Sequence, residues 1–325
     1  MNGQSPMQWR PTATREILMR RAAMLAGVRA FFAARRVLEV ETPILSAAAV
    51  SDPQLESLAT RIAGLPGEFY LQTSPEYSMK RLLAAGSGDI YQICKVFRDE
   101  ERGRWHNPEF TMIEWYRLGF DDAALMDEVE ALVGDLLKPQ RTLPPAERLN
   151  YSTALERHAG VDPFRSSDAA LSAAVQRHGI VCDARLDRDA KLDLLMGLVV
   201  GPRLGRDRPC FICDYPASQA ALARIKPGLP ALAARFELYL DGVELANGFH
   251  ELQDAVEQRA RFSRDMNIRR ERGQVQRPVD EKLLAALEHG MPDCAGVALG
   301  FDRLAALALG ADALGHAMAF TADNA

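Results

Sequence analysis

The sequence predicts an α+β fold, in which a mostly antiparallel β-sheet is flanked by helices. Strand-like segments cluster at 37–117 and again at 209–300, on either side of a helical region, instead of alternating evenly with helices. Asp241-Gly242, between two apolar segments, is a strong signal for the two-residue turn of an antiparallel hairpin. The 325 residues, 48% of them hydrophobic, can bury one large core or two modest ones.

The first predicted element is an amphipathic helix at residues 14–36, because apolar residues recur on one of its faces. These apolar residues are Leu18, Leu25, Val28 and Phe32. The next segment, VLEVETPIL at 37–45, is strand-like but contains Pro43, which cannot donate to a sheet ladder. We therefore expect this strand at the edge of a sheet, where a second subunit could cover it.

The later elements follow from the same periodicities. Strands are expected at 69–73, 90–98, 109–117, 209–214, 235–246 and 295–300. Helices are expected at 122–138, 168–200 and 251–272, and from about 302 onwards.

Composition excludes several classes of protein. Five cysteines are too few for a disulfide scaffold, and the N-terminal residues do not resemble a signal peptide, which favours a reducing cytoplasm. No apolar run approaches the roughly 18 residues of a membrane span. A net charge of -5 supplies no general attraction for nucleic acid.

The segment FRDEERGRWHNPEFTMIEWY, residues 97–116, combines an arginine, several acids and aromatic residues in one predicted hairpin. Residues two apart share a face of a strand, so Arg98 and Glu100 point one way, and Phe110, Glu114 and Tyr116 share a face. Charges on a buried face are costly unless a ligand of opposite charge offsets them. We therefore interpret this face as a pocket for a phosphate-containing ligand, although a solvated hairpin is the alternative.

Two carboxylates flank the predicted turn at 241–242. Counting outward from that turn pairs Tyr239 with Glu244 and Glu237 with Ala246, which makes Glu237 and Glu244 diagonal neighbours on one face. Such neighbours are roughly 7–8 Å apart, close enough to hold one hard cation. An exposed hairpin with both acids in water is equally compatible with this spacing.

Two glycine- or cysteine-containing segments are less specific. GVALGFDRL, at 296–304, places Arg303 in the first turn of a helix after a Gly-rich strand, but it has neither the GxGxxG spacing nor a Walker-type lysine. Cys210 and Cys213 form a lone CxxC pair, which is better explained by a buried strand than by a zinc site.

Together these segments resemble the class II aminoacyl-tRNA synthetases, and in detail the lysyl branch. FRDE with RWHNPEFTMIEWY resembles the second class motif, GVALGFDRL the third, and VLEVETPIL the first, which builds a dimer interface in that family. Arg36-Val37 stands where the family usually has Gly-Phe. The resemblance covers about 14–320 and implies a single catalytic domain over 1–325, with a helical insertion at about 120–205.

The resemblance implies that the chain binds ATP and Mg²⁺. Arg98 and Arg303 would be the catalytic residues, in contact with the α- and γ-phosphates, while Glu237 and Glu244 would hold the magnesium. The implied ATP-binding positions are Arg98, Asp99, Glu100, His106, Asn107, Phe110, Glu244, Leu245, Gly300 and Arg303. The implied amino-acid-binding positions are Ser74, Pro75, Glu76, Glu114, Tyr116, Asn247, Glu251 and Ala298. Several carboxylates around one small site suit a ligand with two ammonium groups.

Two features differ from an ordinary lysyl-tRNA synthetase. About 35 residues precede the first motif, too few for the N-terminal barrel that reads the anticodon. Ser74 and Ala298 stand where the family usually has alanine and glycine. Each difference alters the pocket floor by one small group, which can change the selectivity between substrates by roughly 1–3 kcal/mol. These features resemble a bacterial group of paralogues that activate (R)-β-lysine and pass it to a lysine of elongation factor P.

The resemblance therefore predicts a cytoplasmic, homodimeric ligase that uses ATP, (R)-β-lysine and elongation factor P. A truncated lysyl-tRNA synthetase-like enzyme that activates α-lysine for a tRNA or small-molecule acceptor is one alternative. A catalytically inactive regulatory subunit is another.

Overall fold

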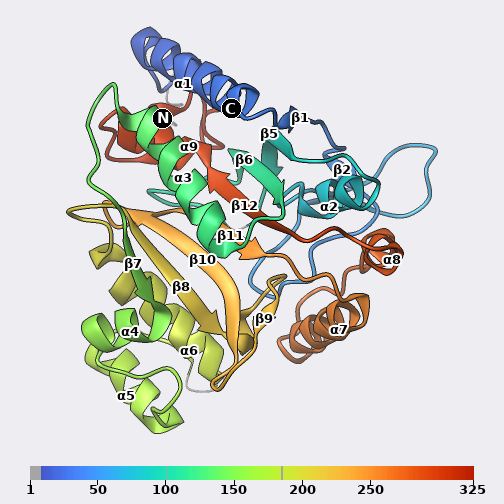
Figure 1. Cartoon of the computed structure of the whole chain (residues 1–325), viewed down its shortest axis with the longest axis vertical. Coiled ribbons are helices and arrows are strands. Elements are labelled where there is room, and N and C mark those ends of the chain that lie inside the picture. Colours follow the sequence, from blue (N-terminus) through green and yellow to red (C-terminus); the bar gives the residue numbers. More distant parts are fainter. Residues whose placement is uncertain (1–8, 100, 184–185) are drawn as a thin grey trace, which may run out of the picture.

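The structure is a computed structural model that describes residues 9–99, 101–183 and 186–325 (Figure 1). Its strands are β1 (Leu38–Glu39), β2 (Leu45–Ser46), β3 (Ala59–Thr60), β4 (Phe69–Leu71), β5 (Ile90–Phe97), β6 (Glu109–Leu118), β7 (Glu147–Asn150), β8 (Cys210–Pro216), β9 (Ile225–Lys226), β10 (Leu232–Leu240), β11 (Val243–His250) and β12 (Cys294–Gly300). Its α-helices are α1 (Arg15–Ala34), α2 (Glu76–Ala84), α3 (Asp122–Leu137), α4 (Tyr151–Ala159), α5 (Asp168–Arg177), α6 (Arg188–Leu195), α7 (Ala255–Glu271), α8 (Glu281–His289) and α9 (Phe301–Ala308).

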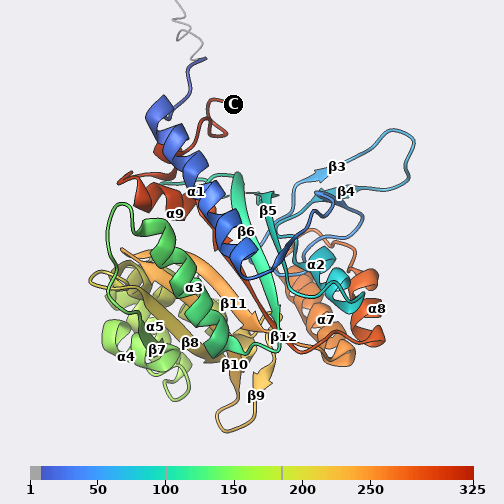
Figure 2. The same ribbon diagram turned by 45° about the horizontal axis from the view of Figure 1, so that its top comes forward.

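Within these residues nine strands form one large sheet, in the order β1-β5-β6-β12-β11-β10-β8-β7, with β9 paired to β10. The pairs β1–β5 and β7–β8 are parallel, and the others are antiparallel. The predicted α+β class with a mostly antiparallel sheet is therefore confirmed. A smaller sheet, β2-β4-β3, lies beside it, and its β3–β4 hairpin projects from the molecule (Figure 2).

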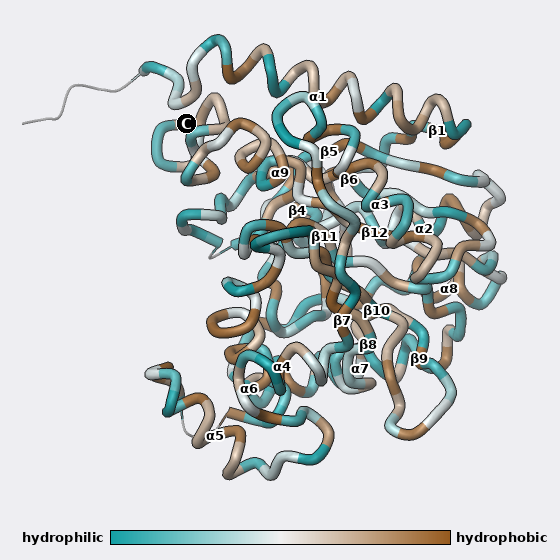
Figure 3. Tube along the Cα trace, turned by 60° about the vertical axis from the view of Figure 1, so that its left-hand side comes forward, coloured by the Kyte–Doolittle hydropathy of each residue, from teal (hydrophilic) through white to brown (hydrophobic). Residues whose placement is uncertain are grey.

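The helix predicted at residues 14–36 is α1. It begins after Thr14, whose side chain accepts a hydrogen bond from Ile17 N, as an N-cap residue does. Val28 and Phe32 are fully buried, and hydrophilic and hydrophobic residues alternate along the helix (Figure 3). The predicted helix is confirmed, and of its predicted apolar face Val28 and Phe32 are buried while Leu18 and Leu25 are half-buried.

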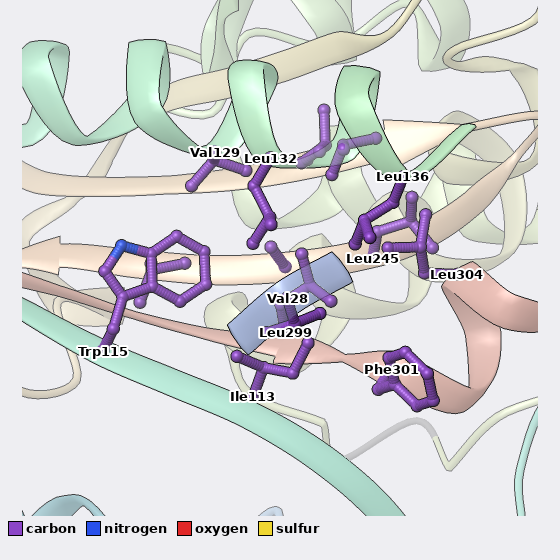
Figure 4. Packing of buried hydrophobic residues seen from close by; sticks show 14 of the residues in the cluster. Val28, Ile113, Trp115, Val129, Leu132, Leu136, Leu245, Leu299, Phe301 and Leu304 are labelled. Atoms are coloured by element: carbon purple, nitrogen blue, oxygen red, sulfur yellow. The ribbon is translucent and has the colours of Figure 1, made fainter. Parts of the chain in front are cut away.

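One face of the large sheet is packed against α3. Ile113 and Trp115 of β6 and Leu299 of β12 lie in one core cluster with Val129 and Leu132 of α3 and with Val28 of α1 (Figure 4). Because side chains alternate along a strand, the residues between these point to the other face. The apolar packing of one face leaves the second face of β6 and β12 free for polar side chains.

The second face is covered in two separate places. Helices α4, α5 and α6 pack over β8 and β10 in one cluster, in which Leu155 and Leu195 meet Ile212. Helices α2, α7 and α8 form another cluster at β5 and β6, in which Met79 and Phe262 are buried. Figure 1 shows these two groups of helices on opposite sides of the molecule.

Several predicted element boundaries are wrong. The single strand expected at 37–45 is two short strands in different sheets, β1 and β2, and Pro43 lies between them. Its position at a sheet edge is confirmed, because β1 is the terminal strand of the large sheet. The helix expected at 168–200 is interrupted after Arg177 and resumes at Arg188. The helix expected from 251 begins only after its N-cap residue, Asp254.

Other assignments are confirmed or extended. The strands expected at 90–98 and 109–117 are the antiparallel pair β5 and β6. A strand that was not predicted, β7, lies within the region expected to be helical and pairs with β8. Cys210 and Cys213 are buried on β8 in two different core clusters, as expected for residues three apart on a strand.

The predicted hairpin register is wrong beyond its first pairs. Tyr239 lies opposite Glu244 as expected, but Glu237 lies opposite Asn247 and not Ala246. The cause is an irregularity of the β-bulge type beside Leu238 and Tyr239. The extra residue on β11 keeps both Glu244 and Asn247 on the same face as Glu237.

The buried side chain of Arg269 joins helix α7 to the segment 52–56. Arg269 of α7 is 0% exposed and donates to the carbonyl oxygens of Asp52 and Leu55 and to the carboxylate of Glu56. Removing it would leave the Leu55 carbonyl and one oxygen of Glu56 without this donor in the interior, where such groups are costly.

We predict that Arg269→Met lowers the free energy of unfolding by about 3 kcal/mol. The measurement is urea denaturation followed by circular dichroism. Arg270→Met is the matched control, because Arg270 is the next residue on α7 and is exposed. Equal denaturation midpoints for the two variants would contradict the prediction.

Candidate active site

A cavity of about 820 Å³ lies on the face of the large sheet that α3 does not cover. Phe110, Met112, Glu114 and Tyr116 of β6 line it, and they alternate with residues packed in the core. The shared face predicted for these residues is therefore the pocket face.

The cavity brings together most of the positions that the sequence resemblance singled out. Those that line it are Ser74, Glu76, Arg98, His106, Asn107, Phe110, Glu114, Tyr116, Glu244, Leu245, Asn247, Glu251, Ala298, Gly300 and Arg303. Pro75, Asp99 and Glu237 are not among the lining residues. Glu100 lies outside the described residues, so its predicted role stays a prediction.

Strand register arranges the pocket residues in rows across the sheet. One row runs from Glu114 on β6 through Ala298 on β12 and Asn247 on β11 to Glu237 on β10. Side chains in such a row are direct neighbours, with β-carbons roughly 4.5–5.5 Å apart. Ala298 thus separates a carboxylate from an amide.

The next row depends on a glycine. Tyr116, Gly296 and Phe249 are paired in register on β6, β12 and β11. A β-carbon at Gly296 would lie 2.3 Å from Cε1 of Tyr116 and 2.5 Å from Oε1 of Glu251. Only glycine therefore lets the Tyr116 ring and the Glu251 carboxylate meet over β12.

Two arginines define one end of the cavity. Arg98 lies with its guanidinium carbon 5.2 Å from the ring centre of Phe110, and its Nη1 is 3.4 Å from Oε1 of Glu101. Arg303, in the first turn of α9, donates to the carbonyl oxygens of Trp105 and Glu244 at 3.1 and 3.0 Å. Backbone acceptors hold both ends of this guanidinium, which fixes its direction.

The loop between β5 and β6 completes this end. Burial and the charge of Arg303 lower the pKa of His106, so its ring is neutral at pH 7. Asn107 donates from Nδ2 to Glu109 O at 2.6 Å and accepts from Ala322 N at 3.0 Å, which ties the loop to the C-terminal segment. This end offers cations and an aromatic face, as a nucleotide requires.

The paired carboxylates differ in their surroundings. Glu237 accepts from Arg235 Nη2 at 2.5 Å and from the hydroxyl of Tyr239 at 2.7 Å. Burial, and then the charge of Glu237, raise the pKa of Glu244. Within the described residues the Glu244 carboxylate has no hydrogen-bond partner, whereas Glu237 has two. A bound cation would therefore stabilise the negative charge of Glu244 in particular.

At the other end, Glu114 is a buried carboxyl held by two hydroxyls. Ser74 Oγ donates to its Oε2 and Tyr116 OH to its Oε1, each at 2.7 Å. Burial, followed by the charge of Glu76, raises the pKa of Glu114 to about 8. Burial likewise raises the pKa of Glu251 to about 7. Both carboxyls would favour a cationic ligand that replaces their protons.

Sequence reasoning missed four residues beside these groups: Lys80, Glu101, Arg235 and Tyr239. Glu101 falls in the charged segment 97–116 and pairs with Arg98, three residues before it in the same segment. Arg235 and Tyr239 lie two residues on either side of Glu237, so the period of a strand places them on its face. Lys80 pairs with Glu251, which is remote from it in the chain, and no local pattern signals this contact.

Comparison with known proteins agrees with this geometry. A family model described as tRNA synthetases class II (D, K and N) matches residues 3–324. The chain belongs to this family, and its use of ATP follows from that membership.

Individual relatives give a more specific comparison. Elongation factor P–(R)-β-lysine ligases from Klebsiella pneumoniae subsp. pneumoniae and from Salmonella dublin are each 50% identical to the chain. The alignments cover 98% of this chain and 98% of each relative. The sequence resemblance to this group of ligases is therefore confirmed. No helix in the described ranges has the length and apolar character needed to cross a membrane.

The raised pKa values predict how ligand binding depends on pH. Below their pKa values of about 8 and about 7, Glu114 and Glu251 are protonated and neutral, so a diammonium ligand must displace protons to bind. We expect the affinity for lysine-like ligands to rise severalfold or more between pH 6 and pH 8.

Isothermal titration calorimetry over this pH range, in buffers of different ionisation enthalpy, measures both the affinity and the protons released. Glu114→Gln is the matched variant, because it removes one titrating group and should flatten the profile. An affinity that falls as the pH rises from 6 to 8 would contradict the assignment.

Proposed function

We propose that this chain activates (R)-β-lysine with ATP and transfers it to the ε-amino group of a lysine on elongation factor P. The observation that carries the proposal is the cluster of Glu76, Glu114 and Glu251 at one end of a cavity whose other end presents Arg98 and Arg303. A small acid with two ammonium groups and a nucleotide would together satisfy these charges. The names of the relatives support the same substrates.

In the first half-reaction, a carboxylate oxygen of β-lysine attacks the α-phosphorus of ATP. The new carbon–oxygen–phosphorus linkage forms as the bond to the bridging oxygen breaks, and pyrophosphate leaves with that electron pair. The nucleophile is already ionised, so no general base is needed. Arg98 and Arg303 are proposed to stabilise the charge on the α- and γ-phosphates, and positioning supplies the rest.

We propose that magnesium binds at Glu244, with Glu237 beside it. Mg²⁺ is commonly bound through one or two carboxylates together with substrate phosphates and water. Residues 9–99, 101–183 and 186–325 contain no group of three or more His, Cys, Asp or Glu side chains placed to hold a metal. A site that takes its remaining oxygens from the nucleotide fits this pair. When bound, the ion would neutralise charge on the phosphates.

In the second half-reaction, the acceptor's uncharged ε-amine attacks the acyl carbon of the adenylate. An amide bond forms as the acyl carbon–oxygen bond breaks, AMP leaves with that electron pair, and the nitrogen loses one proton to water. We infer a homodimer formed through the segment 37–45, because β1 is a sheet edge and Leu38 and Ile44 are 55% and 41% exposed. We further propose that the enzyme acts in the cytoplasm and without anticodon recognition.

Two alternatives make different predictions. A truncated lysyl-tRNA synthetase-like enzyme would activate α-lysine better than the β-isomer. An inactive regulatory subunit would bind ligands without exchange, but such a protein has no need for Arg98, Glu244 and Arg303 in one cavity.

The direct test is mass spectrometry of elongation factor P after incubation with this protein, ATP, Mg²⁺ and each lysine isomer. We expect a mass increase of one lysyl residue on one lysine side chain, with (R)-β-lysine as the best donor. ATP–pyrophosphate exchange without added acceptor isolates the first step. No exchange with any isomer would rule out the enzyme, and faster exchange with α-lysine would favour the first alternative.

The position of Ala298 between Glu114 and Asn247 predicts a change of selectivity. Ala298→Gly removes one methyl group from this row and makes room for the α-ammonium of α-lysine. We expect the ratio of kcat/KM for α-lysine over (R)-β-lysine to rise about tenfold or more, the scale of a single methyl group in a pocket.

ATP–pyrophosphate exchange with both isomers measures this ratio. Ala295→Gly is the matched control, because Ala295 lies on the same strand but is buried in the core. An unchanged ratio in Ala298→Gly would show that Ala298 does not select between the isomers.

A further inference from the structure

Lys80 lies directly behind the carboxylate end of the cavity. It follows Glu76 by one turn of α2 and is 2% exposed, yet it is not among the residues that line the cavity. Its neighbours on the buried face of α2, Met79 and Leu83, pack in the apolar cluster with α8. A lysine in this position must have partners for its charge.

Both partners of Lys80 are pocket residues. Its Nζ lies 2.6 Å from Oε1 of Glu76 and 2.7 Å from Oε2 of Glu251. Each carboxylate therefore gives one oxygen to the lysine and keeps the other. Glu76 and Glu251 come from α2 and from the end of β11, so the same ammonium also fixes the separation of two elements.

The bridge determines the charge of the pocket. Burial opposes the charge of Lys80, but the charges of Glu251 and Glu76 outweigh it and raise the pKa of its ammonium. One permanent positive charge thus stands beside three carboxyl groups, those of Glu76, Glu114 and Glu251. When these are ionised, two negative charges remain for a ligand.

We propose that Lys80 is a positioning and specificity-determining residue, which sets this end of the cavity to the charge and carboxylate spacing that a substrate with two ammonium groups neutralises. The inference rests on the proposed function and extends it to a residue that touches no substrate. A ligand with one ammonium group leaves one carboxylate uncompensated, and the enzyme discriminates against it for that reason.

Chemical rescue tests the role of the ammonium. Lys80→Ala deletes the equivalent of propylammonium, so we expect KM for (R)-β-lysine in ATP–pyrophosphate exchange to rise at least 30-fold. Added propylammonium should recover at least tenfold of this loss, whereas 1-propanol, which has the same chain without the charge, should not. Arg81→Ala is the matched control, because Arg81 is the next residue on α2 and is exposed.

A double variant tests the charge balance without relying on diffusion into a buried site. Lys80→Met removes the positive charge, and Glu251→Gln together with Lys80→Met restores the total. We expect the double variant to bind (R)-β-lysine no more weakly than Lys80→Met alone, because the second change removes the carboxylate that the first left unpaired. A thermal melt of each variant confirms that it is folded.

The outcomes separate the two levels of the proposal. The role of Lys80 would be overturned if the double variant bound (R)-β-lysine more weakly than Lys80→Met alone. It would also be overturned if propanol restored KM as well as propylammonium does. Neither result would contradict the proposed function. Absence of exchange in the unsubstituted protein with every lysine isomer would overturn both.

Discussion

The structure depends on burying charge on one face of a sheet whose other face is packed with apolar side chains. Trp115 and Ile113 of β6 are 0% exposed in the core cluster that includes α3, while Glu114, between them, is 2% exposed on the opposite side. A carboxylate in that position is tolerated because two hydroxyls donate to it and a cavity lies beside it. The helices that cover this face enclose the cavity instead of filling it.

The two ends of the cavity carry side chains of opposite charge. Arg98 and Arg303 gather at one end and are held by backbone acceptors and Glu101, whereas carboxylates gather at the other. A zwitterionic substrate would be favoured with its carboxylate towards the arginines and its ammonium groups towards the acids. Orientation is most of what the activation step requires, because the nucleophile is ionised in solution.

The period of a strand was enough to predict one side of this site. Phe110, Glu114 and Tyr116 share a face because they are two apart, and the structure confirms that this face is the pocket. The partner of Glu237 could not be found in that way, since the irregularity beside Leu238 is a property of the paired strands and not of the turn sequence.

Contacts between segments that are far apart in the chain could not be predicted from the sequence either. Lys80 meets Glu251 only because α2 packs beside the end of β11, and the helix itself was not predicted. The resemblance to a family supplied positions that periodicity could not, but these are positions expected to touch ligands and do not include the residues behind them.

A buried carboxylate on α9 shows how the arginine end is coupled to the rest of the fold. Asp302, beside Arg303, is 1% exposed, accepts from Thr111 N of β6 at 2.6 Å and pairs with Arg21 of α1. Three segments that are remote in the chain therefore meet at one side chain. Helix α1, which supplies Arg21, leads at its other end into β1, the edge strand of the large sheet. The arginine end of the cavity and the helix that precedes β1 are in this way parts of one packed unit.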